Sequence, residues 1–119
     1  MHKLVHIVRF ESARKLTKVP KEHPCSKLYG LAFKLEIHIQ GEIDRESGFV
    51  LDFNEIEKSF SFIYKQIDHR YLNDIEGLDN PTSEVLIEWI WGKLKPKLEP
   101  LVKLVLWENE VSKVEFSGN

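Results

Sequence analysis

Cysteine is almost absent from this chain, which has one, Cys25, among its 119 residues. A single cysteine excludes an internal disulfide, so nothing in the sequence indicates an oxidising compartment. The chain also lacks an internal repeat, a low-complexity segment and an interdomain linker. At this length, these absences predict one compact domain over residues 1–119.

An excess of positive charge is missing as well. Lys and Arg number 17 against 19 Asp and Glu, which gives a formal net charge of −2. Nucleic-acid binding needs a clustered excess of Lys and Arg, so we expect no nucleic-acid partner. No apolar run is long enough to cross a bilayer, and residues 1–6 alternate polar with apolar instead of forming the apolar stretch of a signal peptide. We therefore expect no membrane contact and a cytoplasmic location.

Several segments are typical of strands. Residues 4–10 and 33–40 alternate with period two, and apolar segments at 101–107 and 111–116 are joined around a short polar turn. A turn over residues 41–48 leads into a short apolar stretch, which we expect to be extended.

Two segments have the apolar period of helices. Residues 53–67 follow Asp52, a plausible N-cap, and carry apolar side chains at three- and four-residue steps. A second helix is predicted to begin with Asn80 as its cap and Pro81 at its first position. Its predicted core face consists of Val85, Leu86, Trp89, Ile90 and Leu94.

These elements predict an α+β fold in the order strand-strand-helix-helix-strand-strand. We expect a four-stranded antiparallel sheet with both helices packed on one face. Such a sheet has free edges, so oligomerisation that pairs the edges is a natural solution.

Motifs in a fixed order carry a family resemblance that spans residues 10 to 116. The segments are Phe10-Glu11-Ser12-Ala13-Arg14-Lys15-Leu16, Cys25 to Leu31, Gly48-Phe49-Val50-Leu51-Asp52-Phe53, Asp68-His69-Arg70-Tyr71-Leu72-Asn73, Asn80-Pro81-Thr82-Ser83-Glu84 and Trp107-Glu108. In these segments the chain resembles the 6-pyruvoyl-tetrahydropterin synthase family, and within it the bacterial 6-carboxy-tetrahydropterin synthases of queuosine biosynthesis.

The resemblance implies a tunnelling fold (T-fold) whose subunits join edge to edge into a barrel. Two barrels then stack, so we expect a homo-oligomer, a hexamer of two stacked trimers with active sites between subunits. The implied substrate is a reduced pterin such as 7,8-dihydroneopterin triphosphate. The queuosine branch of the family cleaves its side chain to 6-carboxy-tetrahydropterin, releasing acetaldehyde and triphosphate. The family also carries one zinc ion, held by three histidines.

This chain departs from the family at all three zinc ligands. The positions are occupied by Arg14, Tyr29 and Leu31. Leucine cannot coordinate a metal, arginine stays protonated and a phenol alone is a poor ligand. A substitute site could be built from His23, Cys25 and His69, but zinc needs several ligands at a defined geometry. We therefore predict no metal cofactor and no zinc-dependent activity.

The implied acid/base residues are present. Cys25 matches the general base, a role that needs a thiolate. Asp68 and His69 match the acid/base pair, in which the imidazole exchanges a proton near neutral pH. Read without the resemblance, Cys25 would be a buried structural cysteine and Asp68-His69 a capping or surface pair.

The implied substrate-binding residues are Glu108, Thr82 and Ser83. A carboxylate such as Glu108 can accept hydrogen bonds from the pterin 2-amino group and the adjacent ring N–H. The alternative for Glu108 is a solvated hairpin residue. Thr82 and Ser83 lie near the predicted start of the second helix, where capping is an equally good interpretation.

Three functions remain open at this point. The first is an enzyme that uses Cys25, Asp68 and His69 on a reduced pterin, either an isomerase or a lyase that cleaves a carbon-carbon or carbon-oxygen bond. In it, Arg14 and Tyr29 replace the electrostatics of the metal. The second is a non-catalytic protein that binds a reduced pterin. The third is a structural subunit of a mixed oligomer with a zinc-bearing paralogue.

Overall fold

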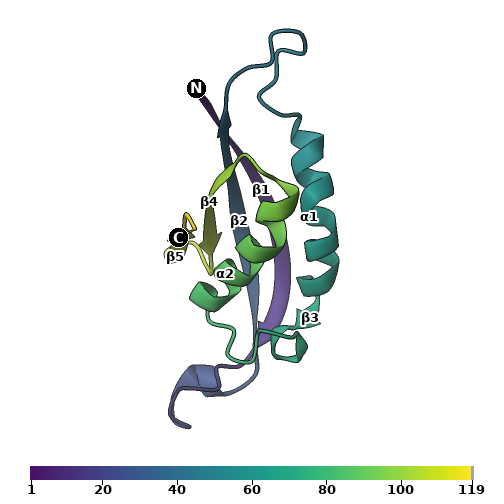
Figure 1. Ribbon diagram of the computed structural model, residues 1–119. Helices are drawn as coiled ribbons and strands as arrows, with labels where there is room; N and C mark the ends of the chain where they lie inside the picture. The colour runs from purple at the N-terminus through teal and green to yellow at the C-terminus, as the bar shows by residue number, and fades with distance from the viewer. Residues whose placement is uncertain (119) are drawn as a thin grey trace.

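The computed structural model describes residues 1–118 of the chain (Figure 1). The molecule is elongated, with principal extents of 57 × 25 × 25 Å. Its elements in chain order are β1 (His2–Arg14), β2 (Tyr29–Gly41), α1 (Phe53–Ile67), β3 (Arg70–Tyr71), α2 (Ser83–Leu94), β4 (Leu101–Trp107) and β5 (Lys113–Phe116), with single 3₁₀ turns at Pro24–Ser26, Leu72–Asp74 and Lys95–Lys97.

A long β-ribbon forms the centre of the sheet. β1 and β2 pair antiparallel over 13 residues each, from His2 opposite Gly41 to Arg14 opposite Tyr29. The two strands run further than the predicted segments because backbone pairing continues where the side chains are no longer apolar. The segment between them, which carries Cys25, extends beyond the sheet at one end of the molecule (Figure 1).

The prediction of a four-stranded antiparallel sheet was wrong. The sheet has five strands in the order β3-β1-β2-β4-β5, and β3 lies parallel to β1 at Ser12 and Ala13. A two-residue strand is too short to show any alternation, so the sequence pattern could not reveal it. β2 ends opposite the start of β1, and α1 then carries the chain back along β1 to Ser12, so β3 runs in the direction of β1.

Both helices contribute to one core with the same face of the sheet, as predicted (Figure 1). Side chains of β1 point alternately toward the helices and away from them, so Phe10 is 2% exposed and Ile7 is 46% exposed. The fully buried helix residues are Ile56, Phe60, Ile63, Ile67, Leu86, Ile87, Ile90 and Leu94. The face opposite the helices carries no helical cover from the described residues.

Two local predictions need correction. α2 begins at Ser83 with Thr82 as its N-cap, not at Pro81, because the Thr82 hydroxyl accepts the Val85 N–H at 3.1 Å. The apolar stretch over residues 49–51 is not a strand: the Phe49 carbonyl accepts its hydrogen bond from the Asp44 N–H of the preceding turn, at 2.8 Å. Within residues 1–118, no helix combines the length and the apolar composition needed to span a membrane.

Candidate functional site

A cleft of about 850 Å³ opens where β1 ends and β2 begins. β4 contributes its last residue and the turn that follows, so segments distant in the sequence meet there. Among the lining residues are Arg14, Cys25, Tyr29, Leu31 and Glu108. The cleft therefore contains all three positions that the resemblance gives to zinc ligands, together with the predicted base and the predicted pterin anchor.

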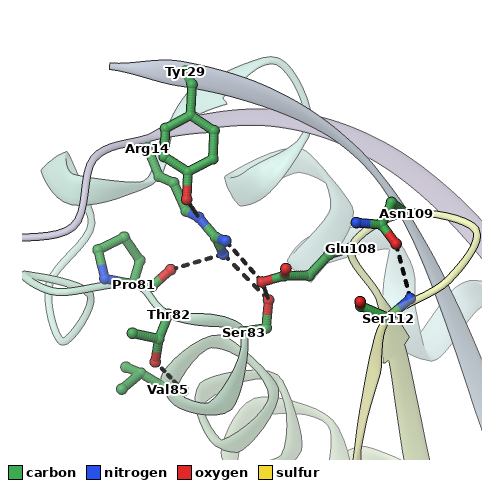
Figure 2. A network of polar contacts seen from close by, with 9 residues as sticks. All are labelled: Arg14, Tyr29, Pro81, Thr82, Ser83, Val85, Glu108, Asn109 and Ser112. Carbon is green, nitrogen blue, oxygen red and sulfur yellow. Dashed lines mark hydrogen bonds and ion pairs between the residues drawn. The ribbon is translucent and has the colours of Figure 1, made fainter. Parts of the chain in front are cut away.

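Arg14 is the centre of the polar network in this cleft (Figure 2). Its side chain is 3% exposed. Nε donates to the Tyr29 hydroxyl at 2.9 Å, Nη1 donates to the Pro81 carbonyl at 3.1 Å and to Ser83 Oγ at 3.3 Å, and Nη2 donates to Glu108 Oε1 at 2.8 Å. A buried guanidinium is stable only when its charge is paired and its N–H groups are bonded, and both conditions are met here.

Glu108 follows directly after β4 and supplies the negative charge of this pair. Its Oε1 accepts a second hydrogen bond, from the hydroxyl of Ser83. Burial raises the pKa of the Glu108 carboxyl, but the hydrogen bonds from Arg14 and Ser83 and the charge of Arg14 outweigh burial and hold the pKa below its usual value. The carboxylate is thus ionised at neutral pH. Its side chain keeps 32% exposure.

The three positions matched to zinc ligands lie together. Arg14 is directly opposite Tyr29 in the β1–β2 ribbon, and Leu31 is two residues further along the same face of β2. These side chains do not suit zinc, since Arg14 is a cation whose N–H groups are hydrogen-bonded and Leu31 has only an alkyl group. Among residues 1–118, no three His, Cys, Asp or Glu side chains are grouped closely enough to hold a metal ion.

Cys25 lies in the 3₁₀ turn Pro24–Ser26 and is half-buried. Its backbone N–H donates to His23 Nδ1 at 3.0 Å, and its carbonyl accepts from the Leu16 N–H at 2.7 Å. The position is therefore held by backbone bonds, which leave the thiol at the wall of the cleft. Burial raises the pKa of the Tyr29 hydroxyl, and its contact with the Cys25 thiol raises it further, so the phenol is a protonated donor beside the thiol.

Asp68 and His69 form a pair at a different place. His69 Nδ1 lies 2.7 Å from Asp68 Oδ2, and Asp68 Oδ1 accepts the Glu11 N–H at 3.0 Å. The Asp68 carboxylate holds the pKa of His69 above its usual value, while the Glu11 N–H is the main cause of the lowered pKa of Asp68. His69 has a positive φ of 55° and a side chain that is 75% exposed.

This pair and Cys25 do not share a cleft within one chain. His69 lines a second groove of about 500 Å³, which shares Gly30, Leu31 and Ala32 with the cleft. Asp68 also ends α1 as its C-cap, so the capping interpretation that the sequence left open is correct for its position.

Sequence reasoning missed part of the cleft. Arg9, Lys34 and Trp107 also line it, and the Lys34 ammonium lies 4.6 Å from the centre of the Trp107 ring. Lys34 lies opposite Arg9 in β1 and opposite Trp107 in β4. This pairing would have placed the three residues together, but it can be used only when the alignment of the strands is known. Thr82, predicted as a binding or capping residue, caps α2, whereas Ser83 is 4% exposed and bonded to Glu108.

The sequence profile described as 6-pyruvoyl tetrahydropterin synthase matches residues 3–119. The chain belongs to this family. A Pyrococcus furiosus protein named dihydroneopterin monophosphate aldolase is 39% identical over 93 residues, covering 76% of this chain and 78% of the relative. A Synechocystis protein named 6-carboxy-5,6,7,8-tetrahydropterin synthase is 34% identical over 91 residues, covering 72% and 69%.

Solved structures agree with this family membership at the level of the fold. The 6-pyruvoyl tetrahydropterin synthase of Caenorhabditis elegans superposes with a TM-score of 0.92 over 99% of this chain and 96% of that chain, at 23% identity. The predicted T-fold is therefore confirmed. This chain is a tetrahydropterin synthase-like protein of pterin metabolism.

Proposed function

We propose that this family member binds a reduced pterin and cleaves a carbon-carbon bond of its side chain without zinc. The observation that carries the proposal is the buried Arg14, a fixed cation at a position matched to a metal ligand and bonded to the predicted anchor Glu108. Cys25 and Tyr29 line the same cleft. A preorganised cation and a phenol beside a thiol can stabilise the negative charge that develops during cleavage.

The reaction class that fits these residues is a retro-aldol cleavage of 7,8-dihydroneopterin or its phosphates. A base takes the proton of the 2′-hydroxyl, the bond between C1′ and C2′ breaks, and the electron pair moves through C6 to N5 of the ring. An acid then returns a proton to C1′. The products are 6-hydroxymethyl-7,8-dihydropterin and a two-carbon aldehyde, and no further reactant is needed to balance the step.

This chemistry does not require a metal, because the N5=C6 double bond of the dihydropterin ring accepts the electron pair. The P. furiosus relative is named as an aldolase acting on dihydroneopterin monophosphate, which supports this class over the formation of 6-carboxy-tetrahydropterin. In our proposal Cys25 is the base, and Asp68 with His69 returns the proton. A thiolate base must stay reduced, which favours a cytoplasmic protein.

The separation of Cys25 from His69 within one chain supports an active site shared between subunits. Among residues 1–118, β3 pairs with the outer edge of β1 at Ser12 and Ala13 and the His69 N–H donates to the Glu11 carbonyl, so most of this strand edge is free to pair with another subunit. Apolar side chains on the uncovered sheet face, such as Val5 and Ile7, also favour burial in an assembly. We propose a homo-oligomer, a hexamer of two stacked trimers, to be checked by light scattering after size exclusion.

The decisive assay uses chelator-treated protein with 7,8-dihydroneopterin and its mono- and triphosphate. We expect release of 6-hydroxymethyl-dihydropterin from at least one of them, and a loss of kcat of about 10²-fold or more in Cys25→Ala. Folding and pterin binding of the variant serve as controls. Turnover that survives Cys25→Ala, or that appears only after zinc is added, would contradict the proposal.

A mixing experiment tests the shared site. Cys25→Ala and His69→Ala proteins should each be inactive, and their co-assembly from a denatured mixture should restore part of the activity. Mixing restores nothing if both residues act within one chain.

A non-catalytic pterin-binding protein is the second candidate, favoured by the same separation of Cys25 from His69. Calorimetric binding of a pterin that is lost in Glu108→Ala, without turnover of any dihydroneopterin, would assign that function instead.

A further inference from the structure

The hydrogen bonds of Arg14 and Glu108 leave a defined pair of groups for a ligand (Figure 2). A guanidinium has five N–H groups, and four of those on Arg14 are bonded to Tyr29, Pro81, Ser83 and Glu108. The fifth belongs to Nη2. The Glu108 atom Oε1 already accepts from both Arg14 and Ser83.

Among the described residues, what remains uncommitted is thus one donor on Nη2 and one acceptor, Oε2 of Glu108. The two groups are neighbours, because Nη2 lies 2.8 Å from Oε1 of the same carboxylate. Both side chains line the cleft, and the Glu108 side chain keeps 32% exposure there.

We propose that the cleft recognises a lactam edge, in which a ligand carbonyl accepts from Arg14 Nη2 and the adjacent ligand N–H donates to Glu108 Oε2. The inference rests on the proposed function, since a pterin presents such an edge at its 4-oxo group and N3–H. It names Arg14 and Ser83 as residues that determine specificity.

Recognition of two neighbouring donors, the 2-amino group and N3–H, would need both oxygens of Glu108. Two hydrogen bonds occupy the usual accepting capacity of Oε1. Displacing the hydrogen bonds that Oε1 accepts would leave the buried charge of Arg14 without its counter-ion. That loss costs far more free energy than the loss of one solvent-exposed hydrogen bond. The 4-oxo group then becomes a recognised feature of the ligand, and the 2-amino group does not.

Ligands that keep the lactam edge but lack the 2-amino group test whether the protein recognises the lactam edge or the 2-amino group. Calorimetry should compare pterin with pteridin-4(3H)-one, which has no group at C2, and with pteridine-2,4-dione, which has a carbonyl there. We expect both to bind the wild-type protein within about threefold of pterin. If the 2-amino group donated to Glu108, its loss would weaken binding about tenfold or more, and the dione would be weakest because its carbonyl faces a carboxylate.

A discrimination of tenfold or more against these two ligands overturns the lactam inference and leaves the proposed function standing. Failure of all three to bind overturns the proposed function itself.

Ser83→Ala provides a second test, because it frees one accepting site on Oε1. We expect this variant to prefer pterin over pteridine-2,4-dione by several-fold, unlike the wild type. Ser61→Ala is the matched control, since that hydroxyl bonds the Lys58 carbonyl on an exposed part of α1. An unchanged ratio of affinities in a folded Ser83→Ala protein would contradict the role given to Ser83.

Discussion

Arg14 is a buried charged residue whose guanidinium is hydrogen-bonded to the side chains around it. Each of its nitrogen atoms has a partner, and its planar fork spans Tyr29, Ser83 and Glu108 in a way that the point charge of a lysine could not. Arg14 thus organises the hydrogen bonds of the cleft from a position that the resemblance matches to a zinc ligand.

Histidines at positions 14, 29 and 31 should create a zinc site. Arg14 and Tyr29 are cross-strand partners and Leu31 lies two residues along the same face, so histidines at the three positions would converge. We expect the variant Arg14→His, Tyr29→His, Leu31→His to bind about one zinc ion per chain, measured by elemental analysis after dialysis. Arg14→His alone should bind none. A folded triple variant without zinc would show that side chains at these three positions do not converge on a metal.

Neutralising Glu108 should destabilise the protein through Arg14. Glu108→Gln keeps the shape of the side chain but removes the counter-charge of a guanidinium that is 3% exposed. We expect the free energy of unfolding to fall by about 1–3 kcal/mol, measured by urea denaturation. Glu110→Gln, in the exposed turn two residues on, should change it little. Equal effects of the two substitutions would mean that the pair with Arg14 contributes nothing to stability.

At the scale of elements, sequence patterns predicted what depends on side-chain periodicity. Both helices and the four longer strands were predicted because apolar side chains repeat along them. β3 was missed because two residues cannot show an alternation and because its partner strand β1 is distant in sequence.

The start of α2 was misplaced for a different reason. Asn80-Pro81 has the residue types of a cap, but Thr82 provides the capping bond instead and Asn80 accepts from the Thr17 N–H. The site could likewise be predicted only in part. Its positions could be matched to the family by sequence, whereas the hydrogen bonds among Arg14, Ser83 and Glu108 depend on tertiary contacts.

The cap of α2 is important for both stability and the site, since Ser83 follows it directly. Thr82→Ala removes the acceptor of the Val85 N–H and should lower the free energy of unfolding by about 1 kcal/mol. Thr82→Ser keeps that acceptor and should restore most of the loss, as thermal or urea unfolding would show. If the serine variant is as unstable as the alanine variant, the threonine methyl group rather than its hydroxyl stabilises this end of α2.

At the scale of the whole molecule, ionised groups connect distant parts of the chain and give the fold a dependence on pH. The hydrogen bond from the Glu11 N–H lowers the pKa of Asp68 and so favours the contact between β1 and the end of α1. Arg14 and Ser83 favour ionised Glu108, which connects β1, β4 and α2. His69 acts in the opposite sense: its pKa is raised, so its contribution is present in acid and is lost as the pH rises through its folded-state value.

The two carboxylates should therefore make the protein less stable as the pH falls. Their pKa values are lower in the folded chain than in the unfolded chain, so the unfolded chain takes up more protons in this window. Their stabilisation is complete above the ordinary carboxylate pKa of about 4 and is lost as the pH falls through the folded-state values. Melting temperatures of the wild type and of Glu108→Gln, measured from neutral pH to about pH 3, should converge in acid, because protonation removes from the wild type the same charge that the substitution removes. Parallel curves would show instead that Glu108 titrates alike in both states and that its bond to Arg14 does not favour the ionised form.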